Sequence, residues 1–332
     1  MSVRFGRSEL PPTQEQALRR AIRIEWFTIA FLVIAISLVY LVMGNSQAMK
    51  AAWIEDLLSL APPIAFLLAV RIVNRTPTPK YPYGYHRSVG VAHLVAGVAL
   101  FAMGLFLIVD SGIGLIAGEH PPIGTVEIFG VTVWLGWLMM LTMALTIPLP
   151  IYFGRVKMKL AQQLHDKVLY ADADMNKADW MTAAGSIVGV AGIGVGLWWA
   201  DATAAVFIAA SILWDGFKNM KRAIADLMDT AATTFDDAER HPLTGQIDEV
   251  LHRQSWVRDA GSRVRDQGHV FHVEAFVVPV NPRRVSLSKL REVRDECINL
   301  DWKIQDIVLV PVDELPAEVG GTSERQSERN LR

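Results

Sequence analysis

Long apolar stretches separated by short polar ones dominate the first two thirds of the chain. Residues 24–43 form a run of twenty whose only strongly charged member, Glu25, lies at its edge. A helix of about 20 apolar residues crosses the ~30 Å hydrocarbon core of a bilayer. The same pattern predicts six membrane-spanning helices, at residues 24–43, 51–73, 89–117, 126–153, a segment ending near 199, and 202–221.

The last third of the chain alternates between helical and strand-like patterns. Two helical segments and three strand-like segments follow one another in the order α-β-β-α-β, with the first two strands meeting at Gln267-Gly268. They are residues 243–252, 262–266, 270–280, 287–300 and 304–312. This order predicts a small two-layer α+β domain of the ferredoxin-like type.

These patterns divide the chain into four parts. We expect an N-terminal segment at 1–23, a membrane domain at 24–222, an α+β domain at 223–315 and a tail at 316–332. The tail is rich in Gly, Ser, Glu and Arg, a composition that predicts disorder.

Composition and charge narrow the class of protein. Hydrophobic residues make up 52% of the chain even without Gly, whereas soluble domains reach about 45–50% with Gly counted. More than half of the charged residues follow residue 222, and the net charge is -2. Cys297 is the only cysteine, which excludes a disulfide framework and a cysteine-cluster metal site. We therefore expect a lipid-embedded protein that is no enzyme, holds no organic cofactor and binds no nucleic acid.

Lys and Arg residues predict the orientation in the membrane. They gather before the first span, between spans two and three, after span four and at the end of span six. The opposite loops, at 44–50, 118–125 and 199–201, are short and poor in these residues. Because basic loops stay on the cytoplasmic side, we expect both termini in the cytoplasm of a multi-pass plasma-membrane protein.

Ionisable residues inside the apolar region indicate function, because each costs roughly 2.5–3.5 kcal/mol to insert into a bilayer. In span two, Glu55 and Ser59 share one helix face, and Asp56 points about a quarter turn away. Pro62-Pro63 follows and predicts a kink that frees backbone carbonyl groups nearby.

Span five carries a second polar group. Asp172, Met175, Asn176 and Asp179 are spaced i, i+3, i+4 and i+7, so they form one stripe, whereas Asp174 and Lys177 lie off it. Carboxylate and amide oxygens suit Mn²⁺ or Fe²⁺, while the imidazole and thiolate groups that Zn²⁺ favours are missing. Two alternatives remain open: Asp172 as a solvated residue at headgroup level, and Met175 as a packing residue.

Further along the same span, glycines recur at small-xxx-small spacing. They are Gly185, Gly189, Gly192 and Gly196. This spacing predicts close approach of a neighbouring helix.

Three features of the chain occur in a characteristic order. The first is the turn Tyr81-Pro82-Tyr83-Gly84-Tyr85-His86-Arg87 into the third span. The second is residues 160–179, a Leu-rich lead followed by Ala171-Asp172-Ala173 and the Met175-xxx-Asp179 pair. The third is the six-span architecture with a C-terminal α-β-β-α-β domain. Together they resemble the cation diffusion facilitator family of proton-coupled divalent-metal transporters. The resemblance covers about residues 24–315 and implies a homodimer formed through the C-terminal domain.

The resemblance also implies a ligand set, from which this chain departs. The family's transport site has two acidic or Asn/His ligands four apart on span two, and His/Asp-xxx-Asp on span five. By position these fall on Glu55, Ser59, Met175 and Asp179, of which two are carboxylates. We expect Asp56, Asp172, Asn176 or water to complete the shell around the metal.

The implied function is export of a divalent transition-metal cation, of the Zn, Mn, Fe, Co or Ni class, from the cytoplasm in exchange for protons. The alternative is a transport-inactive relative that acts as a membrane scaffold or metal sensor, which Ser59 and Met175 keep open. A six-span channel is a weaker hypothesis, because nothing in the sequence is typical of a selectivity filter. His252, His269 and His272, near Glu274, are interpreted as surface or core residues rather than a regulatory metal site.

Overall fold

The structure is a computed structural model that describes residues 10–73, 75, 78–118, 123–128, 130–236, 238–268 and 270–319. The chain divides into two compact units. Gln16–Leu227 forms one unit, and Met228–Arg332 together with Met1–Glu15 forms the other. The predicted boundary at 222/223 lies five residues before the observed one, because the last helix of the first unit continues to Leu227.

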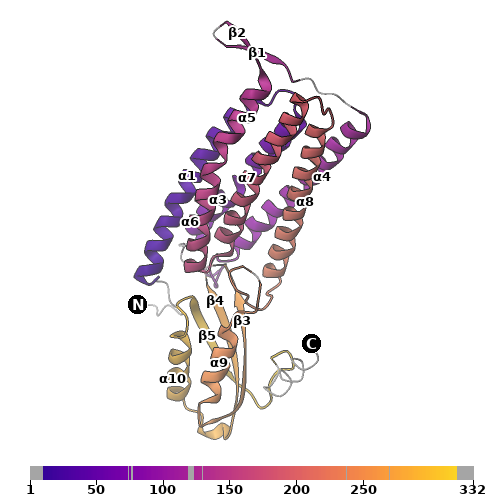
Figure 1. Ribbon diagram of the computed structural model, residues 1–332. Helices are drawn as coiled ribbons and strands as arrows, with labels where there is room; N and C mark the ends of the chain where they lie inside the picture. Colours follow the sequence, from indigo (N-terminus) through magenta and orange to yellow (C-terminus); the bar gives the residue numbers. More distant parts are fainter. Residues whose placement is uncertain are drawn as a thin grey trace. The chain divides into compact units, whose positions relative to one another are not determined.

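The first unit is a bundle of long helices that run alongside one another (Figure 1). Two of its spans are broken into paired helices, α2 with α3 and α5 with α6. The helices are α1 (Pro12–Val42), α2 (Gln47–Leu58), α3 (Ala61–Val73), α4 (Ser88–Ile116), α5 (Leu135–Thr146), α6 (Pro148–Leu164), α7 (Lys167–Gly194) and α8 (Ala200–Leu227).

Five helical segments among the described residues are long and apolar enough to cross a membrane. They are Pro12–Val42, Gln47–Val73, Ser88–Ile116, Leu135–Leu164 and Ala200–Leu227. The expected fifth span is α7, which has 28 residues and is therefore about 42 Å long. It is less apolar because Asp172, Asp174, Lys177 and Asp179 lie in its first half. It nevertheless packs among the apolar segments, against α2, α3, α5, α6 and α8.

The boundaries of the fourth span differ from the prediction. Residues expected to begin that span instead form an antiparallel hairpin of β1 (Thr125–Ile128) and β2 (Val131–Trp134). Gly130 adopts φ +79° between the two strands, a conformation that glycine tolerates. β-branched residues, which are frequent in both strands, favour extended structure, and the span consequently starts at Leu135 and continues to Leu164.

Helices α4 and α8 approach backbone to backbone. A Cβ added to Gly104 would lie 2.5 Å from the Leu213 nitrogen, and one added to Gly97 would lie 2.8 Å from the Met220 nitrogen. Gly216 on α8 would likewise collide with the backbone of Phe101. Only glycine permits this spacing, so α4 and α8 form a tightly packed pair.

The glycines of α7 partly confirm the predicted close approach. A Cβ on Gly189 would come within 2.9 Å of the Ala204 Cβ, and one on Gly192 would collide with Ala200. Gly185 has only ordinary contact distances to Ile208, at 3.9 Å, and Gly196 ends the segment at φ +93°. Close packing of α7 on α8 is thus confined to two positions.

The second unit confirms the predicted α-β-β-α-β order. It contains α9 (Leu243–His252), β3 (Val257–Asp266), β4 (Phe271–Pro279), the short helix η1 (Pro282–Arg284), α10 (Leu287–Ile298) and β5 (Ile304–Pro311). The sheet order is β3-β4-β5, with β4 antiparallel to β3 and parallel to β5. Both helices share one apolar core with the sheet, which includes Leu251, Val273 and Cys297. Residues 320–332, most of the predicted tail, lie outside the described residues.

A candidate metal site between α2 and α7

The break between α2 and α3 places two polar side chains beside α7. Ser59 caps the end of α2: its backbone N–H donates to the Glu55 carbonyl oxygen, and the next N–H, of Leu60, donates to the Leu57 carbonyl oxygen. The Ser59 hydroxyl donates a buried hydrogen bond of 2.7 Å to Oδ1 of Asp179. The predicted juxtaposition of span two and span five is therefore realised at Ser59 and Asp179.

Glu55 lies one turn before Ser59 and is also buried, with 3% of its surface exposed. Its side chain interacts with Thr182 on α7, and the charges of Asp179 and Asp56 act on it. Its Oε2 atom has no hydrogen-bond partner among the described residues. Within the described chain neither Glu55 nor Asp179 forms an ion pair. Two buried carboxylates without a protein counter-charge are costly, and a bound cation or protons would relieve that cost.

The break also supplies backbone oxygens. Pro62 and Pro63 lie in the first turn of α3, and proline has no N–H to donate. The carbonyl groups of Leu58 and Ser59 therefore cannot accept the hydrogen bond that residues four positions on would normally give. The predicted kink is confirmed as a break between two helices.

Asp172 and Asn176 belong to a second buried cluster, away from Glu55. Lys157 Nζ on α6 lies 2.5 Å from Oδ2 of Asp172 and 2.9 Å from Oε2 of Glu25 on α1. Asn176 Nδ2 donates to the Asp172 carbonyl oxygen at 2.7 Å. The predicted stripe on α7 is buried, but its first part faces an ammonium group and only Asp179 faces Glu55.

Sequence reasoning missed Glu25 and Lys157 as members of this cluster. Glu25 was interpreted as the edge of span one, and Lys157 as a loop residue that sets orientation. The polar segment before residue 24 is helical, with Ala17 and Ala21 buried, so Glu25 lies well inside α1. The fourth span ends eleven residues later than expected, which places Lys157 inside α6.

The remaining candidates lie at the margin of the site. Met175 is partly buried and packs in an apolar cluster with Ile54 and Leu58. Asp56 is partly buried, and its charge interacts with that of Asp179. Among the described residues, no group of three or more His, Cys, Asp or Glu side chains is close enough to hold a metal ion. A metal bound between Glu55 and Asp179 would therefore need oxygens from Ser59, the backbone or water.

Another buried carboxylate, Asp201, is fully satisfied by protein groups. Its Oδ1 accepts from the Ser46 hydroxyl and its Oδ2 from the Gln47 N–H, both at 2.6 Å. These bonds tie the start of α8 to the start of α2. Asp201 is thus a structural carboxylate, in contrast to Glu55.

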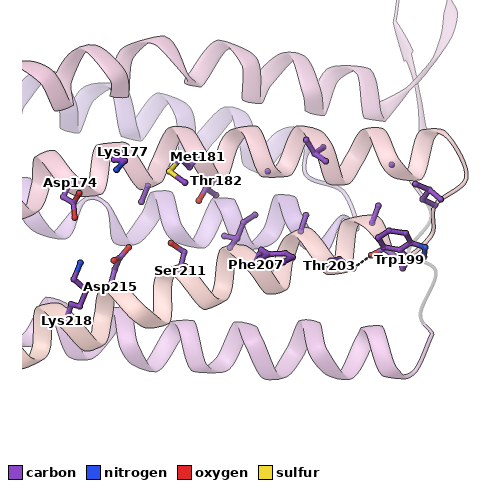
Figure 2. A pocket seen from close by; sticks show the side chains of 18 residues that line it. Asp174, Lys177, Met181, Thr182, Trp199, Thr203, Phe207, Ser211, Asp215 and Lys218 are labelled. Atoms are coloured by element: carbon purple, nitrogen blue, oxygen red, sulfur yellow. Dashed lines mark hydrogen bonds between the residues drawn. The ribbon is translucent and has the colours of Figure 1, made fainter.

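The opposite face of α7 is also polar. Asp174 and Lys177 line a groove of about 810 Å³ between α7 and α8, together with Asp215 and Lys218 of α8 (Figure 2). Thr182, which interacts with Glu55, lies further along the same groove. Asp174 and Lys177 thus lie off the buried stripe, as the helical spacing predicts.

In the C-terminal unit, both described histidines of the predicted set contact carboxylates. His272 Nδ1 lies 2.5 Å from Asp306 and its Nε2 lies 3.5 Å from Glu274. His252 Nε2 lies 3.3 Å from Oδ1 of Asp259, and His269 lies outside the described residues. Burial opposes ionisation of Glu274, but the hydrogen bond and charge of Arg263, with Arg265 and His272, lower the pKa of this carboxyl.

Long apolar helices around buried, uncompensated carboxylates define a class of protein, the membrane transporters of cations. Residues 24–228 match the family model described as the cation efflux transmembrane domain. This match covers more than half of the chain, so the protein belongs to the cation efflux, or cation diffusion facilitator, family. It is a multi-pass membrane transporter for the efflux of metal cations, and divalent metal cations are its substrates.

Curated relatives agree with this assignment. The chain is 26% identical over 296 residues to the uncharacterized transporter YdbO of Bacillus subtilis, covering 87% of this chain and 93% of that protein. It is 25% identical over 204 residues to the manganese efflux system protein MneS of the same organism, covering 60% and 66% of the two chains. It is 23% identical over 190 residues to the magnetosome protein MamB of Magnetospira, covering 57% and 61%.

Proposed function

We propose that this protein exports a divalent transition metal, Mn²⁺ foremost, from the cytoplasm in exchange for protons. The observation that carries the proposal is the pair of buried carboxylates, Glu55 on α2 and Asp179 on α7, whose charges act on each other where the Ser59 hydroxyl donates to Asp179. The proposed ligands are Glu55, Asp179 and the Ser59 hydroxyl, with Asp56 alongside. The all-oxygen set favours a hard ion such as Mn²⁺ over Zn²⁺, and the name of MneS supports the same choice.

Proton exchange follows from the chemistry of carboxylates. A carboxylate binds either a metal ion or a proton, so metal binding at Glu55 and Asp179 releases protons, and protons in turn displace the metal. If the site opens alternately to the two sides of the membrane, an inward proton gradient drives the metal outward. The distribution of basic loops supports cytoplasmic termini, which gives this direction of transport.

Asp172 and Asn176 have a different role in this proposal. Lys157 neutralises Asp172, and both charges act on Asp179 seven residues further along α7. Asp172 and Asn176 therefore adjust the electrostatic environment of the metal ligands, and Met175 packs beside them. The C-terminal unit is proposed to form the homodimer, with the protein in the plasma membrane.

The first prediction tests the ligands directly. In proteoliposomes that report metal and proton movement together, Asp179→Asn and Glu55→Gln are expected to abolish metal-dependent proton flux, because each removes a carboxylate that must bind both ions. Wild-type flux is expected to be larger for Mn²⁺ than for Zn²⁺. The matched control is Asp110→Asn, which changes an exposed carboxylate on α4 and should leave the flux unchanged.

Two results would contradict the proposal. Normal flux in both Asp179→Asn and Glu55→Gln would place the transport site elsewhere. Metal binding without any flux in the wild-type protein would instead support the alternative function, a membrane scaffold or metal sensor.

A further inference from the structure

The groove between α7 and α8 has a charged end and an apolar body. Asp174 and Lys177 of α7 lie at one end, opposite Asp215 and Lys218 of α8 (Figure 2). Beyond Thr182 and Ser211, the walls become apolar, and Val188 and Phe207 are 69% and 74% exposed. The groove therefore has the polarity of an amphiphile.

The four charged side chains at this end are available to a ligand. None of Asp174, Lys177, Asp215 and Lys218 forms a hydrogen bond or an ion pair with another described residue. Their formal charges cancel, with two acids and two bases. A free divalent cation would meet both lysines at the mouth of the groove, whereas a ligand carrying one cationic and one anionic group would find partners for both.

The apolar body is long enough for an acyl chain. From Met181 to Gly192 the lining covers twelve residues of α7, which is about 16 Å of helix, and it continues to Leu197 and Trp199 beyond the end of α7. Half of the hydrocarbon core of a bilayer is about 15 Å thick. A single acyl chain thus fits along the wall while its headgroup reaches the charged end.

We propose that the α7–α8 groove binds one phospholipid whose headgroup carries a primary ammonium and a phosphate, as in phosphatidylethanolamine. The lysines Lys177 and Lys218 take the phosphate, and the carboxylates Asp174 and Asp215 accept hydrogen bonds from the ammonium. A choline headgroup has no N–H to donate and leaves the carboxylates unpaired. A glycerol headgroup adds no positive charge and leaves them uncompensated.

A second groove provides an internal comparison. It lies between α1 and α6, has a volume of about 740 Å³, and carries Arg20, Arg23 and Lys159 among its lining residues. Its lining includes no Asp or Glu. By the same reasoning, this groove favours an anionic lipid such as phosphatidylglycerol.

The test is native mass spectrometry of the full-length, delipidated protein in detergent. The protein is mixed with equal amounts of phosphatidylethanolamine, phosphatidylcholine and phosphatidylglycerol that have identical acyl chains. At one site per protomer, we expect the amount of bound phosphatidylethanolamine to exceed that of bound phosphatidylcholine about five-fold. This ratio corresponds to about 1 kcal/mol of charge-assisted hydrogen bonding.

Two sets of variants distinguish lipid binding at the α7–α8 groove from lipid binding at the α1–α6 groove. In D174N/D215N the excess over phosphatidylcholine should disappear while phosphatidylcholine itself still binds, which shows that the groove is intact. In R20Q/R23Q/K159Q, phosphatidylglycerol binding should fall while the preference for phosphatidylethanolamine remains. Lys177→Gln should weaken both phosphatidylethanolamine and phosphatidylcholine, because both carry the phosphate.

Three results would overturn the proposal. One is equal binding of phosphatidylethanolamine and phosphatidylcholine to the wild-type protein, and another is an unchanged preference in D174N/D215N. The third is dissociation of a dimer in D174N/D215N with no change in bound lipid, since a second copy of the chain would then be the occupant. None of these results depends on metal transport.

Discussion

Lys157 pairs with two buried carboxylates and so distinguishes them from the unpaired carboxylates of the proposed metal site. Its ammonium group lies between the carboxylates of Glu25 and Asp172, and all three side chains are almost completely buried. A buried charge is tolerated when its partner is in place, and removing one partner leaves the other uncompensated. The cluster therefore adds charge pairing to the apolar packing that also joins α1, α6 and α7.

We predict that Lys157→Gln destabilises the membrane unit by about 3–5 kcal/mol, the usual cost of breaking a buried pair. The triple variant E25Q/K157Q/D172N should recover most of that loss, because it removes the charges together. Thermal unfolding in detergent measures both. If Lys157→Gln unfolds at the wild-type temperature, the three charges do not support the fold.

Ser59 permits a gain-of-function test at the proposed transport site. It already lies 2.7 Å from Oδ1 of Asp179, so Ser59→Asp adds a third carboxylate beside Glu55 and Asp179. We predict tighter Mn²⁺ binding, by about ten-fold or more, and slower release, since each added anionic ligand strengthens binding of a divalent cation. Equilibrium titration of the purified protein with Mn²⁺ measures the affinity. Ser211→Asp, on the groove face of α8, is the matched control and should leave it unchanged.

At the scale of elements, the α4–α8 pair is defined by its glycines. The backbone of each helix occupies the space that a side chain of the other would need, at Gly104 and Gly216. Helices in a membrane associate through such close contact, because the hydrophobic effect between them is lost in lipid. The two helices therefore behave as one packed element.

We predict that Gly104→Ala destabilises the membrane unit by about 1–3 kcal/mol, because the new methyl group meets the Leu213 backbone. Gly112→Ala on the same helix is the control, since nothing lies within 4 Å of its added Cβ. Unfolding temperatures of the two variants in detergent provide the comparison. Equal effects at the two positions would show that helix propensity, not packing, determines the outcome.

The sequence predicted elements well where the pattern is local. α9 was predicted at 243–252, and its observed bounds are Leu243–His252. The prediction succeeded because the apolar residues of this segment recur at helical spacing, which differs clearly from the pattern of the strands that follow. Residues 126–134 of the hairpin were wrongly assigned to a span, since their β-branched residues are as apolar as membrane residues. Hydropathy records apolarity, and it cannot separate a strand from a helix in a short run.

The proposed site residues follow the same rule. That Glu55 and Ser59 share a face of α2 could be predicted, because spacing along one helix determines a shared face, whereas Asp179 on α7 was grouped with them through the family resemblance. Lys157 could not, because its partners lie on α1 and α7, far away in the sequence. Which carboxylates are paired and which are left to a ligand depends on tertiary contacts alone.

At the scale of the whole molecule, the chain consists of two units with separate cores. Each has its own source of stability: helix packing in lipid for the first, and a sheet covered by two helices for the second. Unfolding of one is therefore separable from unfolding of the other.

Cys297 provides a probe for the second unit alone. It is the only cysteine in the chain and is fully buried in the C-terminal core. Burial, together with the charge of Glu296, raises the pKa of its thiol to about 12, and the thiolate is the reactive form. We predict that thiol reagents label Cys297 only when this unit unfolds, at denaturant concentrations that leave the helical unit folded. Mass spectrometry of labelling against denaturant measures this, and rapid labelling of the native protein would contradict it.

The break between α2 and α3 has a consequence for how selectivity can change. Two oxygens at the end of α2, the carbonyls of Leu58 and Ser59, belong to peptide bonds, so no side-chain substitution at those positions deletes them. They are left without helical donors by Pro62 and Pro63. Replacing either proline returns an N–H that can engage one of these oxygens. The backbone next to the proposed metal ligands can therefore be altered by substitutions at positions that are not themselves proposed ligands.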